Sequence, residues 1–400
     1  MRKKSFIVLL AVVLLSSMLI SCASGTNDES DAAETEEETP TTEATEAEAP
    51  ASDGILRTGE GPDDKWSASW ADYGRIFKTS VFSRLLKVNE NMEPVYMDLA
   101  EDYEVSDDEL TYTFTLRDDV KWHDGEPFTA EDVKWSIEMA LKSASINAVF
   151  SGAFSKIEGA DAWKDGTADE LTGVTIDGNK ITIQLTEPVG VFLLTMAQWP
   201  PYPKHLLEDE DPATLHLSDF WNKPMGSGRY MVTEVEPNNY GILEVFDDYY
   251  GEKPKIEKIM VQTMTEDQSV TKAQVNELDY HYDMDISRVN EITKNPNYEA
   301  HPVDIIYIRY LMANMMGTDG NGNPKIEDLR VRQALMHAID RETIAEQLYP
   351  EQAVPLHTKV PQGLPEYNDN VVKYDYDPEK AKALLEEADF DFDQTIRLQY

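Results

Sequence analysis

The sequence has few of the residues that would cross-link the chain or give it positive charge. A single cysteine among 400 residues excludes an intramolecular disulfide framework and any zinc site with two or more thiolate ligands. Basic residues are also scarce, because 35 Lys and Arg stand against 76 Asp and Glu, a formal net charge of −41. Such a surface repels polyanions at long range, so we expect no nucleic-acid partner and no direct adsorption to an anionic membrane.

The apolar run at the N-terminus is too short to be a good membrane-spanning helix. It extends over 15 residues, Phe6 to Ile20, whereas a spanning helix needs about 20. Three basic residues precede it and small residues follow it, the order that is typical of a signal peptide. The segment Leu19-Ile20-Ser21-Cys22 resembles a bacterial lipobox, which implies cleavage before Cys22 and a lipid on its thiol. We therefore expect a lipoprotein signal peptide over 1–21 and lipidation of Cys22, with an uncleaved anchor or an ordinary secreted protein as the alternatives.

Large apolar residues are nearly missing from the next segment. Gly25 to Asp53 contains eleven acidic residues and no Lys or Arg. A self-repelling stretch of this kind cannot bury enough surface to offset the entropy of ordering. We expect residues 22–53 to form an acidic, disordered tether that holds the folded part away from the membrane.

The remainder of the chain has enough apolar material for a packed core, with 41% hydrophobic residues overall. Its length favours more than one domain. Thr111 to Arg117 alternates in the manner of a strand, and Thr129 with Asp132 forms a capping-box pattern ahead of a helix. Strand pairs are predicted on either side of Gly178 and of Pro237 to Asn239, and helices after Asp328 and Asp377. The fold class is therefore α/β.

Four segments of the chain stand out as motifs. The first is Tyr112 to Val133, which contains Lys-Trp-His-Asp-Gly. The second is Gly226-Ser-Gly228-Arg-Tyr230, followed by Asp247 to Pro254. The third and fourth are the helices Asp328 to Arg341 and Glu379 to Phe390. In this order the four segments resemble one family, the extracellular solute-binding proteins of peptide ABC transporters, called family 5. Arg229 stands where the family pattern usually has proline.

The resemblance implies a periplasmic-binding-protein-like fold of type II (cluster C), with two large lobes and an inserted smaller lobe. It implies lobe I over 54–94 and 201–303, the inserted lobe II over 95–200, and the start of lobe III over 304–400. Members of the family continue for about a hundred residues or more beyond the last matched helix, so lobe III is expected to be incomplete.

The resemblance also implies a receptor that captures a solute, most simply a peptide, by hinge closure and delivers it to the permease of an ABC importer. Aromatic side chains with a few polar groups suit such a site. The candidate ligand-binding residues, each with a purely structural role as its alternative, are Trp66, Trp70, Asp72, Tyr73, Trp199, Tyr202, Tyr310 and Asn314. We expect no catalytic residue, no resident metal and no cofactor.

Two other interpretations remain open at this point. The solute could be an oligosaccharide or a nickel complex instead of a peptide. The protein could also be a secreted glycosidase or peptidase, because paired carboxylates such as Asp118-Asp119 are abundant. The motifs G-x-S-x-G and H-E-x-x-H and the phosphate-binding P-loop are all absent from the sequence, so the enzyme interpretation has less support. The expected location is the outer face of the cell membrane.

Overall fold

The computed structural model describes residues 53–60, 76–89, 91–303, 308–316, 324–350, 352–362, 367–393 and 396. The chain divides into two units, Met1–Ala51 and Ser52–Tyr400, and the described residues all belong to the second. The signal peptide, Cys22 and most of the tether therefore lie outside the described residues, and these predictions stay predictions. Within the described ranges, no helix combines the length and the apolar character that crossing a membrane would need.

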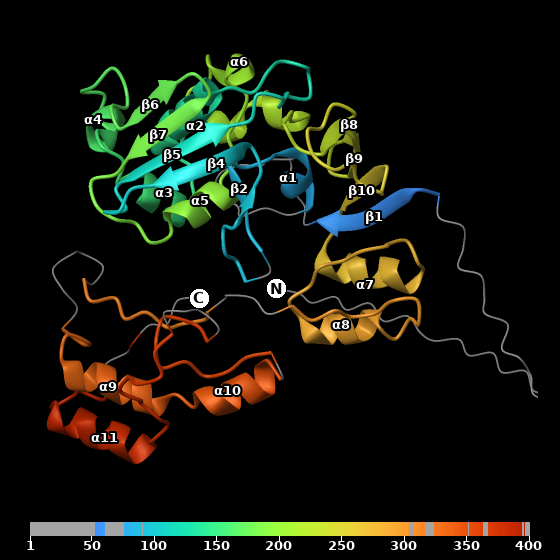
Figure 1. Ribbon diagram of the computed structural model, residues 1–400. Helices are drawn as coiled ribbons and strands as arrows, with labels where there is room; N and C mark the ends of the chain where they lie inside the picture. Colours follow the sequence, from blue (N-terminus) through green and yellow to red (C-terminus); the bar gives the residue numbers. More distant parts are fainter. Residues whose placement is uncertain are drawn as a thin grey trace, which may run out of the picture. The chain divides into compact units, whose positions relative to one another are not determined.

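One antiparallel sheet has the strand order β4-β5-β7-β6 (Figure 1). Its strands are β4 (Ala100–Val105), β5 (Thr111–Leu116), β6 (Val174–Asp177) and β7 (Lys180–Gln184). Tyr112, Phe114 and Leu116 are buried and the threonines between them are half-buried, which confirms the predicted strand. Gly178 has φ +64° in the turn between β6 and β7, a conformation that glycine adopts without strain. The predicted hairpin is confirmed.

Helix α2 (Ala130–Lys142) packs against β6 and β7 of this sheet. It begins where the sequence predicts, because the Asp132 carboxylate accepts hydrogen bonds from the backbone N–H (2.8 Å) and the hydroxyl (2.9 Å) of Thr129. Val133, Ile137 and Ala140 are fully buried along one side of the helix. The shorter helices of this region are α3 (Ala148–Phe154), α4 (Ala160–Lys164), α5 (Phe192–Gln198) and α6 (Lys204–Leu207).

A second sheet has the order β1-β10-β9-β8 and joins segments that are far apart in the sequence. Its strands are β1 (Ile55–Glu60), β8 (Tyr230–Glu236), β9 (Tyr240–Val245) and β10 (Lys258–Thr263). The β8–β9 hairpin is the predicted strand pair around Pro237 to Asn239. Strand β1 runs parallel to β10, with Ile55 opposite Lys258 and Glu60 opposite Thr263. The chain therefore completes the first sheet before it returns to β1.

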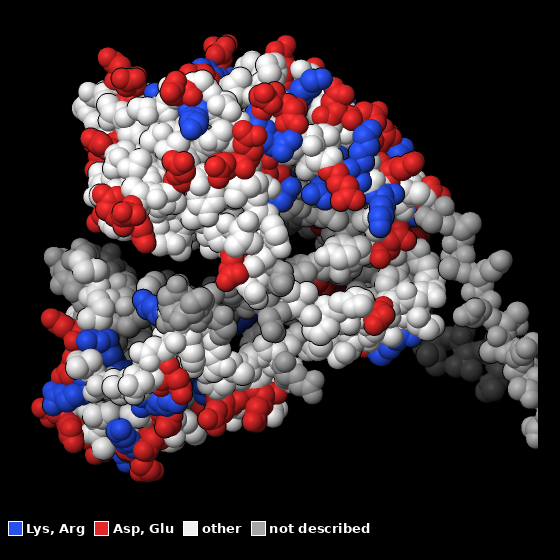
Figure 2. All heavy atoms as spheres, in the orientation of Figure 1, with Lys and Arg blue, Asp and Glu red and all other residues white. Residues whose placement is uncertain are grey.

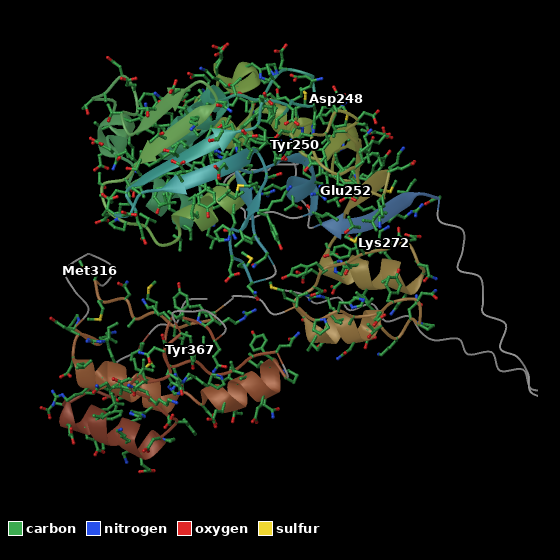
Figure 3. The ribbon with its side chains drawn as sticks, viewed as in Figure 1. Asp248, Tyr250, Glu252, Lys272, Met316 and Tyr367 are labelled. Carbon is green, nitrogen blue, oxygen red and sulfur yellow. The ribbon has the colours of Figure 1, made fainter. Side chains whose placement is uncertain are left out.

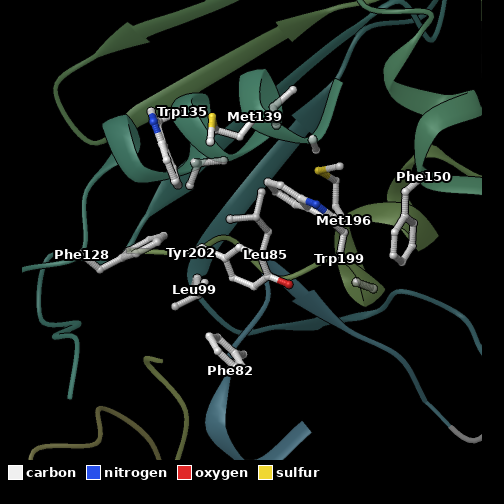
Figure 4. Packing of buried hydrophobic residues seen from close by; sticks show 14 of the residues in the cluster. Phe82, Leu85, Leu99, Phe128, Trp135, Met139, Phe150, Met196, Trp199 and Tyr202 are labelled. Atoms are coloured by element: carbon white, nitrogen blue, oxygen red, sulfur yellow. The ribbon is translucent and has the colours of Figure 1, made fainter. Parts of the chain in front are cut away.

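Both sheets contribute to one hydrophobic cluster, whose largest members include Trp122, Trp199, Trp221, Tyr202 and Phe82. Figure 4 labels Trp199, Tyr202 and Phe82 within this cluster. Around it lie α1 (Ile76–Val81), the two-stranded pair β2 (Leu86–Lys87) and β3 (Tyr96–Met97), and the 3₁₀ turns Leu215–Leu217 and Asp219–Asn222. All strands of the first sheet lie within residues 95–200, the range predicted for lobe II. The two sheets nevertheless share one hydrophobic core, which does not divide at the predicted boundaries. The predicted lobe boundaries therefore remain predictions.

The later part of the chain is mainly helical in its described residues. Its helices are α7 (Glu266–Gln274), α8 (Ile286–Ile292), α9 (Leu329–Ala338), α10 (Arg341–Leu348) and α11 (Pro378–Glu387). Asp328 and Asp377 cap α9 and α11 by accepting the backbone N–H groups of Arg330 (2.8 Å) and Lys380 (2.9 Å), as the sequence predicts. Helices α9 and α11 pack against each other.

Candidate functional site

Four of the predicted ligand-binding residues, Trp66, Trp70, Asp72 and Tyr73, lie outside the described residues. Two others, Trp199 and Tyr202, are 0% exposed and belong to the hydrophobic core. Trp199 meets Phe154 edge to face at 5.1 Å between ring centroids, and Tyr202 meets Trp221 in the same way at 5.1 Å. Burial raises the pKa of Tyr202 well above its ordinary value. In this structure both rings serve the packing, and their contact with ligand stays a prediction.

The remaining two, Tyr310 and Asn314, lie in an exposed segment, 308–316. Tyr310 is 70% exposed, and the Asn314 side chain accepts a hydrogen bond from the backbone N–H of Met316 (3.1 Å). Large apolar side chains beside them are also exposed, namely Leu311, Met312 and Met316, the last of which Figure 3 labels. The segment therefore presents aromatic and thioether groups to solvent, which is compatible with the predicted binding role without testing it.

A group of exposed residues that sequence reasoning missed lies between α7 and α8. Tyr280, Tyr282 and Met284 alternate with polar residues and are 48%, 58% and 51% exposed. The segment begins at the outer side of β1, where the backbone N–H groups of Asp279 (2.8 Å) and Tyr280 (3.1 Å) both donate to the Arg57 carbonyl. We call the three exposed residues the 280–284 ridge. The alternation Asp-Tyr-His-Tyr-Asp-Met-Asp was the signal in the sequence.

Asp283, which lies between Tyr282 and Met284, holds the ridge in place through contacts on its buried side. The Asp283 side chain is 4% exposed, and its two oxygens accept from Arg288 Nε (2.7 Å) and Nη2 (2.8 Å). Arg288 also pairs with Glu266 on α7 (2.7 Å). Burial alone would raise the pKa of Asp283, but the Arg288 hydrogen bonds, the Asp285 backbone N–H and the positive charge of Arg288 together outweigh it, so the pKa is lowered and the carboxylate stays charged. A bidentate pair of this kind fixes the segment against α7 and α8.

His281 lies on the same inner side as Asp283. Its Nε2 is 3.5 Å from Asp283 Oδ2, and neither ring nitrogen has a hydrogen-bond partner among the described residues. Burial lowers the pKa of His281 despite the nearby carboxylate, so the ring is neutral near pH 7. The charged groups beneath the ridge are therefore Arg288 and the carboxylates that pair with it, Asp283 and Glu266.

The 280–284 ridge can make contacts that suit a partly apolar ligand. Two phenol rings and a thioether offer large contact areas at low cost in side-chain entropy, and the phenol hydroxyls can exchange hydrogen bonds. Nothing in this set resembles a nucleophile with its base or a pair of catalytic carboxylates. Within the described ranges, no three His, Cys, Asp or Glu side chains come together in a way that could hold a metal ion.

The described part of the chain combines a mixed α/β fold with an accessible aromatic surface. A sequence profile described as bacterial extracellular solute-binding proteins, family 5 Middle, matches residues 94–398. The chain belongs to this family, whose members are solute-binding proteins and not enzymes. The fold is that of type II periplasmic binding proteins.

Several relatives are similar over most of the chain. A protein of Brucella ovis, provisionally named an ABC transporter peptide-binding protein, is 30% identical over 326 residues, which are 80% of this chain and 56% of that protein. The dipeptide-binding protein of Escherichia coli is 30% identical over 327 residues, covering 77% of this chain and 57% of its own. Among solved structures, NikZ from Campylobacter jejuni in complex with Ni(L-His) superimposes with a TM-score of 0.64 at 26% identity, covering 84% of this chain and 63% of that one. The chain thus spans little more than half the length of these curated relatives.

Proposed function

We propose that this protein is the substrate-binding component of an ABC importer and that it captures peptides outside the cell. The observation that carries the proposal is the family match over residues 94–398, together with relatives whose names assign them peptide and dipeptide binding. The 280–284 ridge supports it, because phenol rings and a thioether can pack against varied peptide side chains.

Capture depends on a change in conformation. A ligand that contacts two lobes only when they are closed stabilises the closed form by its differential affinity for that form. The closed form is then the one that the permease has to recognise. The lobe boundaries predicted from the sequence place the passage from lobe I to lobe III near residue 304, and the ridge precedes it in the chain.

A nickel complex is the second candidate ligand, because NikZ was solved with Ni(L-His). Native mass spectrometry of the full-length protein distinguishes the candidates directly. A peptide receptor retains a heterogeneous set of small masses that fragment as peptides. A nickel receptor instead retains one species with the isotope pattern of nickel. A protein that retains neither, and releases cleaved peptide or sugar, would contradict the proposal.

Attachment to the outer face of the cell membrane through Cys22 is a further part of the proposal. The short apolar run, the lipobox-like segment and the acidic tether support it. We expect Cys22→Ser to abolish both cleavage of the signal peptide and incorporation of labelled palmitate, with Ser24→Ala as the matched control that preserves both. Normal lipid labelling of the Cys22→Ser protein would contradict the anchor.

A further inference from the structure

The structure contains a pocket whose charge is opposite to that of the chain as a whole. A cavity of about 440 Å³ lies between the β2–β3 pair, the end of β5 and the loop 249–255. Its lining includes five basic side chains, which are Lys87, Arg117, Arg229, Lys253 and Lys255. Only two acidic residues, Asp98 and Glu252, line it as well. The whole chain has more than twice as many acidic residues as basic ones, so this local excess of cations is not a reflection of composition.

Aromatic rings and a buried carboxylate form the fixed part of the pocket. Asp98, whose side chain is 2% exposed, accepts hydrogen bonds from the Tyr250 hydroxyl (2.5 Å) and the Arg84 backbone N–H (3.0 Å) and pairs with Lys87 (2.5 Å). The Arg117 guanidinium lies 5.0 Å from the centre of the Tyr250 ring, and Arg229 lies 5.8 Å from that of Tyr249. The charge of Asp98 is thus already satisfied within the protein.

The basic side chains differ in whether a carboxylate already holds them. Arg117 is bound on two sides by Asp119 (2.8 and 2.7 Å), and Lys253 pairs with Asp247 (3.0 Å). Arg229 and Lys255 have no ion pair among the described residues, although carboxylates are abundant on this surface. Figure 2 shows Lys and Arg side chains gathered in the region where Figure 3 labels Tyr250 and Glu252. The guanidinium group of Arg229 and the ammonium group of Lys255 are therefore available to a ligand.

We propose that this pocket binds a small organic anion with two or more carboxylate or phosphate groups. Arg229 and Lys255 would hold the negative groups, and the faces of Tyr249 and Tyr250 would contact the carbon skeleton. The volume is in the range of ordinary small-molecule sites. None of the lining residues belongs to the 280–284 ridge, so this site is additional to the proposed peptide site and does not depend on it.

The test is calorimetric titration of the full-length protein with citrate and, separately, with inorganic phosphate, at low and at moderate ionic strength. We expect citrate to bind with a stoichiometry of one and to weaken as salt is added. Arg229→Gln combined with Lys255→Gln should weaken citrate binding at least about tenfold, because two charge-assisted contacts are lost. If phosphate binds the wild type with the same affinity as citrate, the site recognises phosphate groups. If phosphate binds with lower affinity than citrate, the site recognises carboxylates.

Two further variants separate binding from folding. Glu252→Gln removes a negative group that lines the pocket and should tighten citrate binding, a change that a damaged fold cannot produce. Lys258→Gln is the matched control, since Lys258 pairs with Glu244 (2.7 Å) outside the pocket and should change affinity less than about twofold. No citrate binding by the wild type, or equal weakening by the Lys258 variant and the double variant, would overturn the proposal. Peptide binding in the double variant should stay as in the wild type.

Discussion

His123 links the first sheet region to the Gly226–Gly228 segment through a neutral ring. Its Nδ1 accepts the Gly226 N–H (3.2 Å), and its Nε2 lies 3.0 Å from the Gly228 carbonyl and donates to it. Burial lowers the pKa of His123 to about 4 from an ordinary value of 6.5. Protonation would turn the accepting nitrogen into a donor that faces another donor, so the charged ring does not fit this site.

This pKa predicts how stability changes with pH. Between pH 6.5 and 4 the unfolded chain protonates His123 and the folded protein does not, so the free energy of unfolding decreases as the pH falls through this window. The contribution amounts to about 3 kcal/mol when the window has been crossed. In urea unfolding at pH 7 and at pH 4, we expect His123→Gln to lose stability less steeply than the wild type. The His301→Gln control changes an exposed histidine, retains His123 and should keep the wild-type dependence. Equal dependence in all three proteins would refute the assignment.

Single residues also show where sequence reasoning reaches its limit. Arg330 pairs with Asp328 (2.6 Å), as expected of an arginine near acidic neighbours. Arg332 instead donates to the Ile326 and Glu327 carbonyls (2.9 and 2.6 Å), and Arg341 donates to the Leu356 and Tyr374 carbonyls. The sequence does not reveal which carbonyls remain unpaired after the chain folds.

At the scale of elements, local signals predicted the helices and strands well. Thr129 with Asp132, Asp328, and Asp377 followed by Pro378 each act within one helical turn, so their effect does not depend on the distant chain. Taken from the sequence alone, Gly226 and Gly228 indicate a turn. The structure gives another reason. A Cβ at position 226 would lie 2.0 Å from the Val81 carbonyl oxygen, and a Cβ at position 228 would lie 2.3 Å from the Ser80 carbonyl oxygen. Close packing of α1 against this segment cannot be predicted from a glycine alone.

Two glycine substitutions with opposite expected signs test this explanation. Gly226→Ala places a methyl group against the backbone of α1 and should destabilise the protein by at least about 2 kcal/mol. Gly152→Ala lies in helix α3, where nothing is within 4 Å of the added Cβ, and should stabilise it by about 0.5–1 kcal/mol. Thermal unfolding of the two variants measures both changes. A Gly226→Ala protein as stable as the wild type would show that the segment moves easily.

The 280–284 ridge belongs to no helix and to no regular strand. It was not predicted because alternation over so few residues also fits an ordinary surface strand, and its exposure depends on the pairing with Arg57 and on the Arg288 anchor. The aromatic character of Trp199 and Tyr202 suits a core as well as a ligand site, so the sequence alone does not separate the two roles.

Substitution of the ridge tests its role in binding. We expect Tyr282→Ala to weaken binding of the peptides that co-purify with the wild type by about tenfold, because a large contact surface is lost while the Asp283–Arg288 pair stays intact. Tyr240→Ala, at the β8–β9 turn, is the control and should bind like the wild type. The dissociation constants come from fluorescence titration. Equal affinity of the two variants would place the ligand elsewhere.

At the scale of the whole molecule, the resemblance of four ordered segments identified the family, and the profile match over 94–398 confirms it. The α/β class followed from the mixed strand and helix patterns. The pairing of β1 with β10 did not follow from the sequence, because parallel contacts between residues 203 positions apart leave no local signal. The substrate also depends on side chains that meet only in the folded protein, which is why the ridge had to be found in the structure.

The most direct test of the central claim is equilibrium dialysis of the full-length protein against a defined mixture of dipeptides and oligopeptides, followed by mass analysis of both compartments. We predict that selected peptides accumulate in the compartment that contains the protein. They should remain intact, and no more than one peptide should be bound per chain. A receptor shifts its conformational population on binding and leaves the solute chemically unchanged. Failure to retain any peptide, or the appearance of cleaved fragments in proportion to protein and time, would contradict the account.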